Sequence, residues 1–344
     1  MLWRGMLREK HPQAVFKMID NLLASSRAAL QGAGWRVPVA VMSFNRPHYL
    51  EPVLDSLAAQ TALTGRAIFL FQDNAVSPHS GKRYADDVDI ARCVEMFHRI
   101  FPSGTVMLAE HNLGIARNFL RAEEFVFDAC ENDACYFFED DMILSPHYLT
   151  MMDRIYSFAK EHEKVGYFGA YGSLRMPLSE QRKQCHSMKR LSFHWGFGLT
   201  RRHWADLRLW LEPYYQFTAN MDYKDQRRFE IARAYRERGI PVTTANQDVM
   251  KQIGTTELGR VSIATTACFA NYIGVQGVNC TPEKFDRQGF GRSLLYPEPV
   301  ELKFPSDQQL INWHAQQKRV QWERFNARVN KGSRKSGLVL ADGD

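Results

Sequence analysis

The sequence predicts an α/β fold in which a mostly parallel sheet carries helices on both faces. Short apolar segments of strand length alternate with longer amphipathic segments along most of the chain. This alternation is typical of parallel strands joined by crossover helices. The 344 residues are 45% hydrophobic and 24% charged, which is ordinary for a globular protein. At this length a core needs no disulfide or structural metal to hold it together.

The predicted elements follow one another in regular order from residue 37 onward. The helix after the first strand begins at Pro47, a residue type favoured in the first helical turn. The predicted strands are Val37–Ser43, Arg66–Gln72, Thr105–Glu110, Ala134–Phe138 and Val165–Ala170. The predicted helices are 47–60, 82–100, 114–129, 146–161, 201–211, 224–238 and 308–330.

Four parts follow from this order. Residues 1–36 form a helical arm, because apolar residues recur there at helical spacing. Residues 37–142 and 143–305 form the two halves of the sheet domain, and 306–344 hold a polar helix and a tail expected to be disordered from Asn330 onward.

Charge and composition narrow the class of protein. Lys and Arg number 44 and Asp and Glu 38, so the net charge is +6, which permits an anionic ligand, a nucleic acid or an acidic membrane and requires none of them. No apolar run is long enough to span a bilayer. The six cysteines form no C-x-x-C pair, so we expect a reduced, soluble, cytoplasmic protein. A peripheral membrane contact through Leu2, Trp3 and Leu7 stays open.

Polar side chains follow four of the predicted strands. Arg46 follows the first strand and Asp73 the second, while Asn112 and Arg117 follow the third. The acidic triplet 139–141 follows the fourth. Because the carboxyl ends of parallel strands share one edge of a sheet, where ligands of such folds bind, we expect a site there.

The triplet Glu139-Asp140-Asp141 is the strongest signal. Carboxylates this close together repel one another, and a hard divalent cation such as Mg²⁺ or Mn²⁺ relieves the repulsion. The alternative is a solvated acidic turn before the helix at Pro146.

The other strand-end residues also have two interpretations each. Asp73 either accepts a hydrogen bond from a nucleobase or ribose, or caps a turn. Arg46 either contacts a nucleotide or forms a surface ion pair. Asn112 and Arg117 lie at a helix start, which either binds an anion or is an ordinary N-terminus.

These segments resemble the GT-A-fold, nucleotide-sugar-dependent glycosyltransferases over roughly residues 37–265. The likeness is greatest to family 13, the N-acetylglucosaminyltransferase I type, and weaker to family 2. Asn45-Arg46 resembles that family's Asp-Arg, Phe71-Gln72-Asp73 its Ser-Gln-Asp, Ile115-Ala116-Arg117 its Ile-Ala-Arg helix, and Glu139-Asp140-Asp141 its metal motif.

The resemblance implies roles for these residues. Asp141 is the metal ligand for Mn²⁺ or Mg²⁺, and Glu139 and Asp140 face the sugar and the ribose. Asp73 holds the uracil, and Arg46 contacts the nucleotide. Residues 37–142 then bind the nucleotide-sugar.

The second half carries three further matches. The segment with Trp195 and Phe197 resembles the one that borders the sugar and acceptor. Asp222 corresponds to the catalytic base, with Asp225 as a rival and a helix N-cap as the alternative. The segment 253–262 resembles a Gly-containing loop over the nucleotide, in which Arg260 meets a phosphate; the alternative is a plain turn.

The implied activity is a metal-dependent, inverting transfer of a hexosyl or N-acetylhexosaminyl group. The donor is a nucleotide-sugar, UDP-linked by the resemblance, and the acceptor is a hydroxyl on a glycan or another molecule, bound by residues 143–305. A hydroxylated base in DNA is a second acceptor class, suggested by the basic pairs Arg201-Arg202 and Arg227-Arg228 and the cluster at 331–335.

Two other classes of function stay open. A sugar nucleotidyltransferase would carry a Gly-rich loop after the first strand, and Ser43–Pro47 has no glycine. A non-catalytic nucleotide- or glycan-binding module would not need an acidic triplet. The donor sugar, the acceptor and the oligomeric state are not determined by the sequence.

Overall fold

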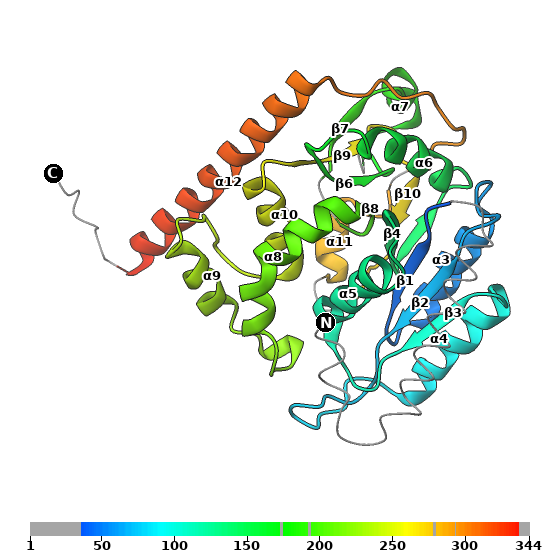
Figure 1. The fold of residues 1–344 in the computed structure, drawn as a ribbon, viewed down its shortest axis with the longest axis horizontal. Helices are drawn as coiled ribbons and strands as arrows, with labels where there is room; N and C mark the ends of the chain where they lie inside the picture. Colours follow the sequence, from blue (N-terminus) through cyan, green and yellow to red (C-terminus); the bar gives the residue numbers. More distant parts are fainter. Residues whose placement is uncertain (1–35, 173–174, 192–193, 278–279, 293, 337–344) are drawn as a thin grey trace.

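The computed structural model describes residues 36–172, 175–191, 194–277, 280–292 and 294–336 (Figure 1). The predicted arm at 1–36, with Leu2, Trp3 and Leu7, lies outside this part except for its last residue. The strands are β1 Val39–Ser43, β2 Ile68–Gln72, β3 Thr105–Leu108, β4 Ala134–Glu139, β5 Met142–Leu144, β6 Val165–Gly169, β7 Met188–Arg190, β8 Gly196–Thr200, β9 Val261–Thr265 and β10 Ala270–Tyr272. The helices are α3 Pro47–Ala58, α4 Asp87–Ile100, α5 Gly114–Glu124, α6 Tyr148–Ala159, α7 Leu178–Gln184, α8 Arg201–Phe217, α9 Arg228–Arg236, α10 Gln247–Glu257, α11 Pro282–Gln288 and α12 Asp307–Ser336, with single turns at Phe125–Ala129 and Tyr223–Asp225.

The central sheet has eight strands in the order β3-β2-β1-β4-β8-β6-β9-β7. β8 and β7 are antiparallel to their neighbours, and the other six strands run in one direction. The predicted α/β fold with a mostly parallel sheet is therefore confirmed. From β1 the chain adds β2 and β3 on one side and then β4 on the other. The strand order thus reverses between β1 and β4, the position at which open α/β sheets form a crevice.

Helices cover both faces of the sheet, as predicted (Figure 1). Along β1, Val39 and Val41 belong to a core packed against α3, α4 and α6. Ala40 and Met42 belong to a second core, packed against α5, α8 and α10. This alternation follows from the two-residue period of a strand, and it makes β1 apolar on both sides.

Some predicted boundaries are wrong. β8 was not predicted, because its two glycines argue against a strand; a Cβ at Gly198 would overlap the ring of Phe168, so close strand packing requires glycine there. The helix predicted at 224–238 is a single turn at Tyr223–Asp225 followed by α9. α12 continues through Asn330 to Ser336, where disorder was expected.

The short connection between α10 and β9 fixes the direction of α10. Only Leu258–Arg260 separate the two elements, and Gly259 turns the chain with a positive φ of 74°. α10 therefore packs antiparallel to β9. Its C-terminus lies at the amino edge of the parallel strands, and its N-terminus at the carboxyl edge, where β1 and β4 also end.

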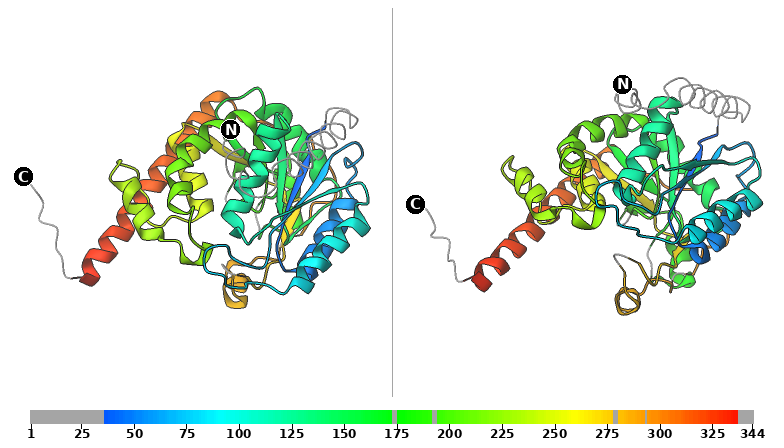
Figure 2. Two further views of the ribbon diagram at one scale, coloured as in Figure 1. Left: turned by 60° about the horizontal axis from the view of Figure 1, so that its bottom comes forward. Right: turned by 90° about the horizontal axis from the view of Figure 1, so that it is seen from below.

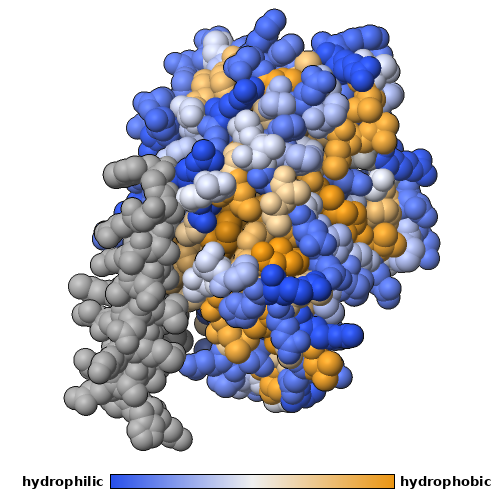
Figure 3. Space-filling model, turned by 90° about the vertical axis from the view of Figure 1, so that its right-hand side faces the viewer, coloured by the Kyte–Doolittle hydropathy of each residue, from blue (hydrophilic) through white to orange (hydrophobic). Residues whose placement is uncertain are grey.

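α12 runs along α10 and then extends away from the rest of the chain (Figure 2). Near its start, His314 and Gln317 bond to Thr256 of α10. Hydrophobic residues on the face shown in Figure 3 are dispersed among hydrophilic ones. Within the described ranges, no helix combines the length and the apolar character needed to cross a bilayer.

Candidate active site

Arg46 contacts two acids where the strand order reverses, and two further acids lie within electrostatic range of them. We call Glu139, Asp140, Asp141 and Asp248, together with Arg46, the acid cluster. Arg46 follows β1, and its Nη2 pairs with Asp140 and lies 2.9 Å from Asp141 Oδ2. Burial lowers the pKa of Arg46, but the acids around it outweigh that effect and raise the pKa. The structure therefore brings Arg46 and the triplet together at one edge, as the sequence predicted.

Asp141 has the features expected of a metal ligand. It is buried, and its Oδ1 has no hydrogen-bond partner within the described residues. Burial raises its pKa to about 6, against the opposing effect of Arg46. An unpartnered buried carboxylate oxygen is costly unless a cation or a ligand satisfies it.

A segment after β10 covers Asp141. Ile273 N donates to the Asp141 carbonyl at 2.9 Å. A Cβ added to Gly274 would lie only 2.5 Å from Asp141 Oδ2, and one on Gly277 would lie 3.3 Å from Arg46 Nη1. The space beside the Asp141 carboxylate therefore exists because residue 274 has no side chain.

These residues fit Mg²⁺ or Mn²⁺ that is shared with a ligand. Among the residues that the structure describes, no three His, Cys, Asp or Glu side chains gather in a metal-binding group. A complete protein cage is therefore not built there. Mg²⁺ commonly takes only one or two carboxylates and fills its other positions with waters and substrate phosphates, which the single free oxygen of Asp141 suits.

Asp248 is the residue that the sequence reasoning missed. It lies in the first turn of α10, at the carboxyl edge, where its side chain reaches solvent although the protein packed around it partly desolvates the carboxylate and raises its pKa. Burial raises the pKa of Glu139 well above its ordinary value, and the charges of Asp141 and Asp248 raise it further. Asp248 therefore faces the triplet within electrostatic range. It is an accessible carboxylate opposite a candidate metal ligand.

A local signal could have located α10. The Asn246 side chain accepts a hydrogen bond from Val249 N at 2.9 Å, a common N-cap. Val249, Met250 and Ile253 then follow at helical spacing. Assigning the later part, 253–262, to a loop concealed this pattern.

Asp73 acts as a cap within the protein, the second of its two interpretations. Its Oδ1 accepts from Asn74 N and Leu113 N at 2.9 and 2.8 Å. Its Oδ2 accepts from Gly114 N at 2.9 Å and from the Asn112 amide at 3.3 Å. These four contacts use the acceptor sites of a carboxylate. The predicted uracil contact of Asp73 and the predicted ligand contact of Asn112 therefore gain no support.

The anion site predicted at the start of α5 is occupied by a carboxylate of the protein itself. Asp73 is the anion at this N-terminus, and Tyr223 covers it: Gly114 has a φ of 69°, and a Cβ there would lie 2.5 Å from Tyr223 Cβ. Arg117 points elsewhere, because it donates to the carbonyls of Tyr215 and Thr218 at 3.0 and 3.4 Å. These bonds place the Arg117 guanidinium at the C-terminus of α8, so the predicted nucleotide contact of Arg117 gains no support from them.

Asp222 is held by hydroxyl groups and not poised as a base. Ser77, Ser80 and Tyr84 all donate to its buried carboxylate. Burial alone would raise the pKa of Asp222, but these three bonds outweigh it and lower the pKa to about 2. A carboxylate this acidic is a poor proton acceptor near neutral pH. These hydrogen bonds favour a structural role for Asp222 over its predicted role as the base, and its rival Asp225 donates its backbone N–H to Asp222 O.

The two residues predicted to contact the acceptor sugar lie in different environments. Phe197 is 1% exposed and stacks 5.4 Å from Phe137 in the core, so its predicted contact with a sugar is wrong. Trp195 lies at the edge of the site. Its carbonyl accepts from Glu139 N at 3.0 Å, and its ring stacks 4.1 Å from Tyr272. Trp195 stays a predicted acceptor residue.

Arg260 lies at the wrong edge of the sheet for its predicted role. It immediately precedes β9, at the amino edge, and it pairs with Asp206 and donates to Glu163 O at 3.0 Å. The predicted Gly-containing loop at 253–262 consists of the end of α10, a turn and the start of β9. The predicted phosphate contact of Arg260 is therefore wrong.

The basic pairs considered for DNA are partly used within the fold. Arg201 and Arg202 donate to backbone carbonyls, and Arg227 lies 3.4 Å from Glu230. The side chains of 331–335 lie outside the described part. None of the six cysteines forms a disulfide in the described part of the chain.

Comparisons with known proteins add no family. No protein-family model matches the chain, and neither does any curated protein. Solved structures with partial likeness include the Mn²⁺ and UDP complex of glucosyl-3-phosphoglycerate synthase from Mycobacterium tuberculosis, at 14% identity and a TM-score of 0.31, over 52% of this chain and 61% of that one. Another is the galactosyltransferase LgtC with donor and acceptor sugar analogues, at 12% identity and a TM-score of 0.32, over 76% of this chain and 98% of that one. At such scores the likenesses carry no argument about fold or function.

Proposed function

We propose that the chain is a metal-dependent glycosyltransferase of the GT-A type. It transfers a sugar from a nucleotide-sugar donor to an acceptor hydroxyl with inversion at the anomeric carbon. Glycans or other hydroxyl-bearing molecules are the acceptor class. The resemblance of the acidic triplet and its flanking segments to family 13 motivates this proposal.

One observation carries the proposal. The free, buried Oδ1 of Asp141 lies at the point where the strand order reverses, with the exposed carboxylate of Asp248 facing the same triplet. A single metal-binding carboxylate and a separate accessible base are what a one-step displacement on a diphosphate-linked sugar requires.

Each residue of the site has a separate role in the proposed reaction. Asp141 holds the divalent cation together with the donor diphosphate, and the cation when bound neutralises the charge on the departing nucleoside diphosphate. Asp248 accepts the proton of the acceptor hydroxyl. Glu139 and Asp140 face the sugar and ribose. Arg46, now paired with Asp140 and Asp141, exchanges this contact for the donor's phosphates.

The nucleotide preference is a separate question from the reaction. UDP was favoured through Asp73, and Asp73 is committed to the start of α5. The resemblance still places UDP-sugars first among the donors, but because Asp73 is committed elsewhere the other nucleotides are included in the test.

A donor-hydrolysis screen tests the proposal. The protein is incubated with UDP-, GDP-, dTDP- and CMP-sugars with Mn²⁺, and the released nucleotide is measured. We expect slow hydrolysis of one donor that is lost on chelation and in Asp141→Ala. Glu95→Ala, at an exposed acid of α4, is the matched control. The absence of hydrolysis and of metal-dependent nucleotide binding would reject the function.

A further inference from the structure

A buried ion pair lies one turn along α10 from Asp248. Lys251 Nζ lies 2.5 Å from Glu123 Oε1, and the two side chains are 2% and 3% exposed. In the described part of the chain, no other ion pair has both side chains buried to this degree. Lys251 Nζ also lies 4.8 Å from the ring centre of Phe119. The pair joins α10 to α5 across the interior.

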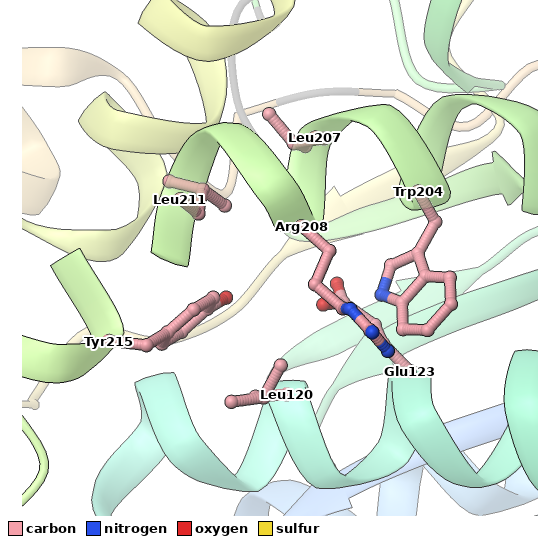
Figure 4. A pocket seen from close by; sticks show the side chains of 7 residues that line it. All are labelled: Leu120, Glu123, Trp204, Leu207, Arg208, Leu211 and Tyr215. Atoms are coloured by element: carbon pink, nitrogen blue, oxygen red, sulfur yellow. The ribbon is translucent and has the colours of Figure 1, made fainter. Parts of the chain in front are cut away.

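The mostly apolar surroundings of Glu123 give this ion pair a high desolvation cost. Figure 4 shows Glu123 facing a small pocket between α5 and α8, lined mainly by Trp204, Tyr215 and aliphatic side chains. Burial raises the pKa of Glu123, and Lys251 opposes that effect. A buried ion pair is often no more stabilising than apolar side chains of the same size. Stability alone therefore does not explain the pair.

Its position relative to Asp248 suggests what it does. Residues three apart on a helix lie on the same side, with Cβ atoms about 5–6 Å apart. Asp248 and Lys251 are so placed on α10, and the Lys251 charge opposes the burial effect that raises the pKa of Asp248. Lys251 lies in the interior, so solvent screens its charge less than it screens the charge of a surface lysine.

We propose that the Lys251–Glu123 ion pair is a positioning device for Asp248. It anchors the first turns of α10 to α5, and it supplies a fixed buried positive charge that stabilises the Asp248 carboxylate. Glu123 holds Lys251 in place and moderates that charge. The catalytic part of this inference rests on the proposed function, since Asp248 is the base only there.

Other groups also act on Asp248 and stay unchanged in the test. Glu139 faces it from β4, Tyr214 from α8 and Tyr167 from β6, and Tyr171 lies just beyond β6. Of the groups named, Lys251 is the one whose positive charge favours the ionised form.

Two substitutions with opposite expected effects test the device. Lys251→Met removes the positive charge, so the apparent pKa of Asp248 should rise by on the order of one unit. Glu123→Gln leaves the Lys251 charge unopposed, so that pKa should fall. The acidic limb of the donor-hydrolysis pH profile should move in the same two directions.

The titration of Asp248 is also measured without activity. Carbon-13 carboxyl resonances, assigned with Asp248→Asn, are followed against pH in the protein free of metal and nucleotide. Arg66→Met is the matched control, because Arg66 is a fully buried cation paired with Asp153 on the opposite face of the sheet. It should leave the titration of Asp248 unmoved.

The outcomes separate the two proposals. Shifts in the same direction for Lys251→Met and Glu123→Gln, or no shift in either, would overturn the positioning role. If the wild-type protein hydrolyses no donor but the resonances shift oppositely, the ion pair still tunes Asp248 and only the proposed function fails.

Discussion

Two sets of carboxylates occupy the same edge of the sheet and differ in what surrounds them. Asp73 and Asp222 receive hydrogen bonds from backbone amides, an asparagine amide and hydroxyls. In the acid cluster, Arg46 is the one cation, and Asp141 keeps an unpartnered oxygen. A carboxylate whose acceptor sites are filled holds the fold together, whereas an unsatisfied one is available to a ligand.

The largest expected difference between the two sets concerns activity. Asp248→Asn keeps the shape of an exposed side chain but removes the proton acceptor. Donor hydrolysis should fall by about 10²- to 10⁴-fold, with little change in thermal stability. Asp222→Asn should retain activity within a few-fold. Steady-state rates for both variants check this, and the opposite ranking would return the base to Asp222.

The second-largest effect should be a pH dependence of stability that Asp73 causes. Burial raises its pKa to about 6 from an ordinary 3.8, despite its backbone hydrogen bonds. Because the pKa of Asp73 is higher in the folded state than in the unfolded state, the folded protein binds this proton more tightly. The free energy of unfolding should therefore fall as the pH rises from about 4 to 6. The loss should be on the order of 2–3 kcal/mol.

Urea unfolding of the wild-type protein and of Asp73→Asn between pH 4 and pH 7 measures this. The difference between their free energies of unfolding should change across the window. A difference that stays constant would mean that Asp73 titrates at its ordinary pKa.

A smaller loss of stability should follow the removal of the Asp222 carboxylate. Asp222→Ala leaves the hydroxyl of Ser77, a buried residue, without its acceptor. The expected cost is about 1–3 kcal/mol. Asp225→Ala, at an exposed position, should change the free energy of unfolding by less than about 0.5 kcal/mol. Equal effects from both substitutions would remove the structural role of Asp222.

The smallest effect should come from crowding Asp141. Gly274→Ala places a Cβ 2.5 Å from Asp141 Oδ2 and 2.4 Å from the Tyr272 hydroxyl. Because one of these groups must move, Mn²⁺ affinity in the presence of nucleotide should fall by about tenfold. In Gly277→Ala the new atom meets only the flexible end of Arg46, and the effect should be weaker. Calorimetric titration of both variants tests the order. Unchanged affinity in Gly274→Ala would argue against a cation at Asp141.

Much of the first half of the fold could be predicted because strand and helix periods differ and the two kinds of segment alternate regularly there, whereas the alternation is less regular from about residue 146 onward. β1, β2 and β4 and the triplet after β4 were predicted where they occur. β8 was missed because a strand with two glycines looks like a loop until its close partner, Phe168, is known. α10 was missed because Gly254 and Gly259 suggested a hinge.

The site was harder to predict than the fold for a physical reason. Residue type and spacing identify where carboxylates gather, but not which donors reach them. The hydroxyl donors to Asp222 come from Ser77–Tyr84, some 140 residues earlier in the chain. The acceptor sites of the Asp73 carboxylate are occupied by the backbone amides of Leu113 and Gly114, which lie in another loop. Asp248 lacked any motif of its own, and only the antiparallel packing of α10 on β9 brings it to the edge.

The capped start of α5 has a consequence for how a donor would be recognised. With its positive end capped by Asp73, this helix offers a diphosphate little attraction, and in the acid cluster the acidic side chains outnumber the one guanidinium. A doubly charged ligand would be repelled from this edge on its own, and so would gain affinity only together with a cation. Since such coupling is reciprocal, nucleotide and metal should each tighten the binding of the other by the same factor.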